Sequence, residues 1–187
     1  MKSHLYYLVS PKDNKRNHNE KEVEGGKLIV NSDLQDHIHV NREAVIESVP
    51  MLNDLGLSVG DEVIVHHNIF RRFYDMQGNE KNSRWYVDGD IYKCTNETIF
   101  MVKREGSWTP LDGFCFVKPI DNTNMWSEDK EEPLKGLITY VPKELKDLGI
   151  SENALIGFTP MSEYEFNIDG DKLYRVPSNS VSILYED

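Results

Sequence analysis

The chain contains one short sequence twice, as LNDLGLS at residues 52–58 and as LKDLGIS at residues 145–151. A constant shift of 93 residues (145 − 52) relates the two copies without a gap. Apolar residues around them keep the same shift and pair Val45 with Ile138, Val63 with Ile156 and Phe73 with Phe166. The repeat indicates two small domains of related fold within the 187 residues.

A second repeated sequence shows where the two copies differ in length. VSPKDN at residues 9–14 recurs as VKPIDN at residues 117–122, a shift of 108 (117 − 9). The first copy therefore carries fifteen additional residues (108 − 93) between its proline and its Leu-Gly turn. We expect the function to lie in this insertion.

Short β-branched and aromatic runs, separated by Gly, Asn, Asp and Pro, predict an all-β chain. They occupy residues 5–9, 28–30, 44–49, 62–66, 69–74, 84–87, 98–102, 114–117, 136–141, 154–158, 164–168, 172–176 and 181–184. Asp169 and Gly170 predict a tight hairpin, because a primed turn needs positive φ angles that glycine adopts at no steric cost. Sheets of this size close most simply into barrels, which leave no exposed edge.

We therefore expect two tandem small β-barrels, one in residues 1–105 and one in residues 112–187. The linker is predicted near residues 103–112, where Gly106 and Pro110 lie. Residues 142–148 can form a helical turn that Gly149 ends. The acidic stretch at 121–133 is expected to be a loop early in the second domain.

Composition argues against several classes of function. The net charge of −11 repels nucleic acid and anionic membranes, so neither is an expected partner. Cys94 and Cys115 have no metal or disulfide spacing and are expected to be buried thiols. The apolar run at 5–9 is too short for a signal-peptide core, and no stretch reaches transmembrane length. These features predict a soluble cytoplasmic protein.

The insertion has an unusual composition. Residues 12–24 contain a single apolar residue, Val23, and cannot bury enough surface to offset the entropy of ordering, so we expect a mobile segment. It leads into Gly25, Gly26, Lys27, Leu28, Ile29 and Val30. A flexible tether with an apolar tip is typical of a recognition element that orders on binding. The alternative is that residues 28–30 are simply the second strand of the domain.

Read in order, these sequences resemble the GroES-like co-chaperonins. In that family a strand and a proline lead into a long mobile loop with Gly-Gly and an aliphatic triplet, followed by a Val-Gly-Asp turn and a terminal Asp-Ile strand. The corresponding sequences here lie at residues 9–11, 25–30, 59–65 and 90–91. The resemblance covers residues 4 to 103 and extends more weakly, through the repeat, to 114–184.

The resemblance implies that residues 25–30 dock into an apolar groove of a GroEL-type chaperonin ring, which the protein caps while an unfolded client protein folds inside. The family's roof hairpin is reduced here to residues 50–58, as in the bacteriophage versions, whose client is capsid protein and which act in the host cytoplasm. The second copy has Met125, Trp126 and an acidic run in place of the triplet, so it is not expected to bind the ring in the same way.

The sequence also contains residues that suggest other chemistry. His66 and His67, adjacent on a predicted strand, would leave opposite faces, whereas His37 and His39 share a face and could chelate a metal, as in a cupin-like metalloenzyme. Alternating carboxylates at 163, 165, 169 and 171 are typical of a solvated face. The aromatic residues at 70, 73, 74, 85 and 86 could form a ligand shelf but more often pack in a core or interface.

The leading hypothesis is thus a non-enzymatic co-chaperonin without a metal or cofactor, in which one docking loop per chain requires a cyclic homo-oligomer, a heptamer for a seven-membered ring. A GroES-like barrel that acts as a chaperonin-independent binding or assembly protein is the second hypothesis. The metal-dependent barrel enzyme is the third.

Overall fold

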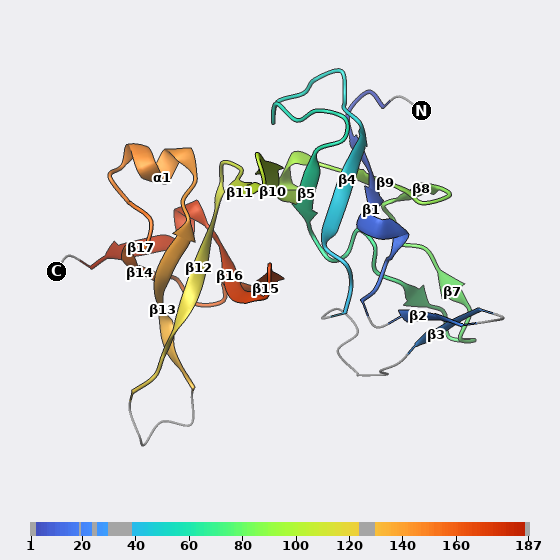
Figure 1. Ribbon diagram of the computed structural model, residues 1–187. Coiled ribbons are helices and arrows are strands. Elements are labelled where there is room, and N and C mark those ends of the chain that lie inside the picture. The colour runs from blue at the N-terminus through green and yellow to red at the C-terminus, as the bar shows by residue number, and fades with distance from the viewer. Residues whose placement is uncertain (1–2, 19, 24–25, 30–38, 124–129, 186–187) are drawn as a thin grey trace. The chain divides into compact units, whose positions relative to one another are not determined.

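A computed structural model describes residues 3–18, 20–23, 26–29, 39–123 and 130–185 (Figure 1). The described chain is mostly β and divides into two compact units, residues 1–107 and 108–187. Each unit contains one main antiparallel sheet.

The first sheet has seven strands in the order β11-β10-β5-β4-β1-β9-β8 and lies in the first unit, except that its edge strand β11 extends beyond the boundary at residue 107. Its strands are β1 (Tyr7–Pro11), β4 (Glu43–Ser48), β5 (Glu62–Val65), β8 (Tyr86–Asp88), β9 (Ile91–Cys94), β10 (Ile99–Arg104) and β11 (Ser107–Pro110). A 3-10 turn, η3 (Asn96–Thr98), joins β9 to β10. Strand β1 pairs with β4 on one edge and with β9 on the other, which places it inside the sheet.

The second unit has a six-stranded sheet in the order β15-β16-β12-β13-β14-β17. Its strands are β12 (Phe114–Asp121), β13 (Glu131–Tyr140), β14 (Leu155–Phe158), β15 (Tyr164–Ile168), β16 (Asp171–Pro177) and β17 (Val181–Leu184). The helix α1 (Lys143–Asp147) lies between β13 and β14, and the 3-10 turn η4 (Ser178–Ser180) precedes β17.

The two sheets have the same strand order once β11 is set aside, and the residue register is repeated as well. Val9 pairs with Ile46 as Val117 pairs with Ile138, with shifts of 108 (117 − 9) and 92 (138 − 46). Three further pairs repeat in the same way: Val9–Tyr92 as Val117–Tyr174, Ile99–Val65 as Val181–Phe158, and Val102–Val63 as Leu184–Ile156. The sequence repeat therefore corresponds to a repeat of backbone topology and register.

This register corrects two of the predicted equivalences. Ile138 corresponds to Ile46 and not to Val45, because Ile46 and Ile138 are both fully buried and both pair with the first strand of their unit. Phe73 and Phe166 are not equivalent, since Phe73 is 41% exposed whereas Phe166 is buried at 2%. The equivalence of Val63 with Ile156 is confirmed.

The shifts also show that the first unit has two insertions, where the sequence analysis found one. Between β1 and β4 the first unit is longer by sixteen residues (108 − 92), one more than expected. Between β5 and β9 the shift falls from 93 (158 − 65) to 82 (174 − 92), so this connection is longer by eleven residues. We call residues 12–42 the first connection and residues 66–85 the second connection.

Several local predictions can be compared with the structure. Asp169 and Gly170 both have positive φ (52° and 90°) and join β15 to β16, which confirms the predicted hairpin. The predicted helical turn is α1, and Gly149 follows it with φ 87°. The predicted strand at 69–74 is wrong except for its last two residues, because Ile69 and Phe70 lie in a buried turn.

The boundary between the two units, after residue 107, falls within the predicted linker at 103–112, although most of this stretch is strand. Its first residues end β10, Glu105 and Gly106 form a turn with positive φ, and β11 (Ser107–Pro110) joins the sheet beside β10. Glycine and proline in this stretch therefore mark a hairpin turn and a strand end. Of the predicted acidic loop, residues 121 and 131–133 belong to β12 and β13, and residues 124–129 lie outside the described part of the chain.

Both cysteines are buried and free, as the sequence predicts. Burial raises the pKa of the Cys94 thiol and that of the Cys115 thiol to about 12, which keeps both protonated at neutral pH. Among the described residues, no helix has the length and apolar character needed to span a membrane.

Gly136 provides a test of the packing in the second unit. A Cβ atom there would collide with the Val117 side chain and lie 2.7 Å from the Lys118 backbone oxygen. We expect Gly136→Ala to lower the unfolding free energy of this unit by about 2 kcal/mol, because strand β12 must shift. A urea titration followed through amide NMR signals of residues 131–184 measures this change.

Gly157→Ala is the matched control, because its Cβ would make ordinary contacts of 3.4–3.5 Å with Ile183 and Tyr185. Its effect should stay below about 1 kcal/mol. Equal destabilisation by the two substitutions would contradict the packing described here.

Candidate functional site

The first connection contains the larger of the two insertions that distinguish the units. It begins with a 3-10 turn, η1 (Lys12–Asn14), and contains a two-stranded hairpin, β2 (Glu20–Val23) paired with β3 (Gly26–Ile29). The segment at 12–24, which is expected to be mobile, thus contains a 3-10 turn and one strand of a hairpin where it is described. Backbone hydrogen bonding within the hairpin supplies local order that side-chain composition alone does not reveal.

The predicted site residues are distributed over this hairpin. Gly26, Lys27, Leu28 and Ile29 form β3, and Leu28 pairs with Lys21. Gly25 and Val30 lie outside the described residues. The structure therefore brings four of the six predicted residues together on one strand, opposite the acidic and basic residues of β2.

The two ends of the first connection are held together by backbone pairing. Asn17 forms an antiparallel bridge with Val40, the His18 amide donates to the His39 carbonyl at 2.8 Å, and the Asn41 amide donates to the Arg16 carbonyl at 2.8 Å. Asn17, Val40 and Asn41 are nearly inaccessible to solvent. This pairing fixes where the hairpin segment leaves the unit and where it returns.

The Asn41 side chain stabilises the same closure. Its amide nitrogen donates to the carbonyl oxygens of Lys12 (3.1 Å) and Lys15 (2.8 Å), and its amide oxygen accepts from the Glu43 backbone N–H at 2.9 Å. Asn41 thus hydrogen-bonds three backbone groups at this bend.

An ion-pair network lies at the start of the connection. The Lys12 ammonium contacts Glu43 (2.6 Å) and Glu62 (3.0 Å), and Lys103 lies 3.7 Å from Glu62. The hydrogen bond from Lys12 lowers the pKa of the Glu62 carboxyl, and the two carboxylates raise the pKa of Lys12, chiefly through its hydrogen bond to Glu43. The network ties η1 to strands β4 and β5.

The second connection folds against the same region of the first unit. It contains a small hairpin, β6 (Phe73–Tyr74) paired with β7 (Glu80–Lys81). The Asp75 carboxylate organises its turn by accepting from the backbone amides of Gln77 (3.0 Å) and Asn79 (2.8 Å). The buried Ser83 hydroxyl donates to the Ile69 carbonyl at 2.7 Å and closes the connection on itself.

Arg16 links the two connections. Its Nε donates to the Phe70 carbonyl (3.2 Å), and its Nη1 contacts Glu80 (3.2 Å) and Asn82 (3.4 Å). The guanidinium carbon lies 5.6 Å from the centre of the Tyr92 ring, and the side chain is only 11% exposed. The guanidinium is planar, has five N–H donors and can stack on an aromatic ring, so it can make all of these contacts at once. The ammonium group of a lysine cannot.

The metal-binding reading gains no support from this geometry. His66 and His67 do not leave opposite faces of a strand, because β5 ends at Val65 and the two rings stack with centroids 4.3 Å apart. His39 is described but His37 is not. Among the described residues, no three His, Cys, Asp or Glu side chains are grouped so that they could hold a metal ion.

Arg16 and the second connection were missed by sequence reasoning, although a signal was present. Asp-Gly-Asp occurs at residues 88–90 and again at 169–171, a shift of 81 (169 − 88) that differs from the 93 of the central repeat. That difference in shift reveals an insertion between the central repeat and the Asp-Gly-Asp sequence.

The predicted aromatic cluster does not stay together. Phe70 is buried, whereas Phe73 and Tyr74 are exposed.

No protein-family model matches the chain, and no curated protein is significantly similar to it.

The role of Arg16 can be measured by hydrogen exchange. Replacing Arg16 by alanine leaves the Phe70 carbonyl and the Glu80 carboxylate without this donor, so local opening of the first connection should become easier. We expect the amides of His18 and Asn41 to exchange at least about tenfold faster in Arg16→Ala. Arg84→Ala is the control, since Arg84 is exposed and lies over the Trp85 ring at 4.7 Å. Unchanged exchange in Arg16→Ala would contradict the bracing role.

The ion pairs of Lys12 predict a pH effect. Because the folded pKa of Glu62 is depressed, its contribution to stability is present above the unfolded pKa and is lost as the pH falls through the folded value. Lys12→Met should raise the pKa of Glu62 toward its usual range and reduce this acid sensitivity. Carbon-13 NMR titration of the Glu62 carboxyl measures the shift. Lys146→Met should leave Glu62 unchanged, because Lys146 pairs with Glu152 in the other unit.

Proposed function

We propose that the protein is a non-enzymatic co-chaperonin of the GroES-like type, which caps a GroEL-type ring while an unfolded client folds. The first unit docks through residues 25–30 of its hairpin segment. In this proposal each unit is a small GroES-like β-barrel, and the second is a degenerate copy.

The observation that carries the proposal is the placement of β3 within the first connection. Gly26 to Ile29 form one strand of a two-stranded hairpin that belongs to neither main sheet, inside a connection whose ends are clamped by the Asn17–Val40 bridge. The equivalent connection of the second unit is sixteen residues shorter. A segment whose two ends are already fixed loses less conformational entropy when it binds. It can therefore present its aliphatic residues to a groove of a partner at a small entropic cost.

The reduced roof fits a phage-type co-chaperonin. Residues 49–61, between β4 and β5, contain turns and no strand, and Met51, Leu52 and Val59 there are exposed. One docking segment per chain gives weak single contacts, so capping a ring requires several chains that act together. A homo-oligomeric ring, a heptamer for a seven-membered chaperonin, meets this requirement.

A chaperonin-independent binding or assembly protein is the second candidate. The exposed apolar residues of the loop at 49–61 favour it, because they could contact a partner without the hairpin. The two candidates differ in whether a chaperonin ring with bound ATP is captured.

Ile29→Asp tests the docking segment. A carboxylate buried without a partner in an apolar groove costs several kcal/mol, so capture of a GroEL-type ring in the presence of ATP should weaken by about 100-fold or more. Modulation of the ring's ATPase rate should be lost in parallel. Circular dichroism and the amide NMR spectrum of the main sheet of the first unit serve as the folding control.

The matched variant is Val59→Asp, which places the same charge on an aliphatic residue of the first unit that is 63% exposed. It should retain capture and ATPase modulation. If Ile29→Asp captures the ring as well as the native protein does, residues 25–30 are not the docking segment. Absence of any capture by the native chain would favour the assembly-protein candidate.

A further inference from the structure

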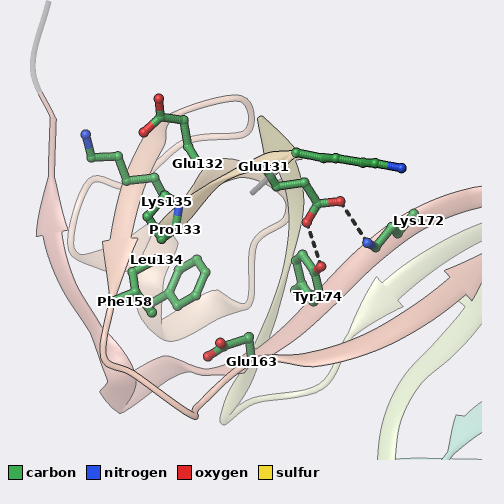
Figure 2. Close-up of a pocket in the computed structure, with 10 residues that line it drawn as sticks. Glu131, Glu132, Pro133, Leu134, Lys135, Phe158, Glu163, Lys172 and Tyr174 are labelled. Atoms are coloured by element: carbon green, nitrogen blue, oxygen red, sulfur yellow. Dashed lines mark hydrogen bonds and ion pairs between the residues drawn. The ribbon is translucent and has the colours of Figure 1, made fainter. Parts of the chain in front are cut away.

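A cavity of about 460 Å³ lies beside Tyr174 in the second unit, and the polar side chains on this wall are matched with one another (Figure 2). Glu131 accepts from the Lys172 ammonium at 2.7 Å and from the Tyr174 hydroxyl at 2.6 Å. The same ammonium lies 5.1 Å from the centre of the Tyr174 ring. A feature of this unit without such a match is the outer edge of strand β17, at one end of the six-stranded sheet.

The backbone of β17 is hydrogen-bonded on one side only. The strand pairs with β14, and no other strand of the described chain lies along its outer edge. The Tyr185 amide donates to the Leu155 carbonyl at 2.9 Å, so the backbone groups of Tyr185 point toward β14. Successive residues of a strand direct their N–H and C=O groups to opposite sides, so those of Leu184 point outward. They are available to a further strand.

The internal repeat shows the same edge in a covered form. Strand β10 is the equivalent of β17, and β11 pairs with its outer side. Met101 and Val102 of β10 are 0% and 4% exposed, whereas the equivalent Ile183 and Leu184 are 50% and 41% exposed. Both strands have an irregularity in their inner pairing at the same point, so this irregularity does not prevent an outer strand from pairing.

The residues of β17 lack the features that usually keep sheet edges apart. Charged residues and proline on an edge strand oppose pairing with another chain. The other three edges of the two main sheets have one of these features, since β8 ends at Asp88, β11 ends at Pro110 and β15 contains Glu165. Strand β17 reads Val-Ser-Ile-Leu and has neither. Two copies of it therefore meet no like-charge repulsion along the strand.

We propose that β17 pairs antiparallel with β17 of a second copy of this chain, across a two-fold axis at Leu184. In this register Leu184 lies opposite its own counterpart, and the two residues exchange a pair of backbone hydrogen bonds. Ile183 lies opposite Tyr185 of the partner subunit, and a β-branched residue opposite an aromatic one is a favourable cross-strand pair. Such a contact joins chains, or rings of chains, in pairs, and it does not depend on binding to a chaperonin.

Sedimentation equilibrium of the full chain tests the pairing, in about 0.15 M salt to screen the repulsion between chains of net charge −11. For so small an interface we expect a Kd on the order of 100 µM, so the mass should nearly double between about 10 µM and about 1 mM protein. Leu184→Lys places like charges opposite each other and should raise this Kd at least about tenfold. Val87→Lys, which changes an exposed aliphatic residue of the edge strand β8, is the matched control and should associate like the native chain.

A mixture of two variants tests the two-fold register. Residue 184 meets residue 184 in this register, so Leu184→Lys and Leu184→Glu should each associate weakly alone and should recover a Kd within about threefold of the native value when mixed. If β17 instead pairs with a different edge strand of the second copy, or with another protein, the mixture stays as weak as each variant alone. That result would overturn the proposal.

Leu184→Cys gives a readout that does not require a charged side chain at the edge. Residues that face each other as a hydrogen-bonded pair have Cα atoms about 5.5 Å apart, which suits a disulfide, and both native cysteines are buried. Under mild oxidation Leu184→Cys should form a covalent dimer at least about tenfold faster than Val87→Cys. Equal rates for these two variants overturn the proposal, as does a native chain whose mass does not rise up to about 1 mM.

Discussion

Each unit depends on hydrogen bonding along both edges of its first strand. Strand β1 pairs with β4 and β9, and β12 pairs with β13 and β16, so a strand from the start of each unit lies inside its sheet. Three consecutive residues of each of these strands are buried on both faces: Tyr7, Leu8 and Val9 in β1, and Cys115, Phe116 and Val117 in β12. The strands on either side take their register from this one, and the pairings beside it recur in both units.

The sequence predicted the all-β class, most strands, the hairpin at Asp169 and Gly170, and an insertion in the first unit. These features depend on local turn chemistry and on periodicity, which are visible in a few consecutive residues. The errors arose where tertiary contacts decide. Phe73 has the same residue type and spacing as Phe166, yet it is exposed in an added hairpin. Arg16 reads as one more charge in a polar stretch until folding places Phe70, Glu80 and Tyr92 around it.

The two units serve as references for each other. Where the first unit has a tyrosine covered by an arginine and a phenylalanine, the second has a tyrosine whose ring centre lies 5.1 Å from the Lys172 ammonium, with a cavity beside it. The strands that carry the two tyrosines are nevertheless paired identically. The difference follows from connection length, since the covering residues belong to segments that the second unit has in shortened form. One backbone arrangement thus supports different side-chain surroundings for the two tyrosines.

The clamp between Asn17 and Val40 has a consequence for how such a chain can change over evolutionary time. Strand β1 reaches its partner β9 across 87 residues (94 − 7), whereas β12 reaches β16 across 61 (176 − 115). Closing the longer loop costs only about 0.3 kcal/mol more in chain entropy. Since the ends of the first connection are paired before the hairpin segment departs, additions beyond the bridge leave the register of the sheet unchanged. New segments can therefore be acquired, exchanged or lost at this point with little effect on the stability of the folded sheet.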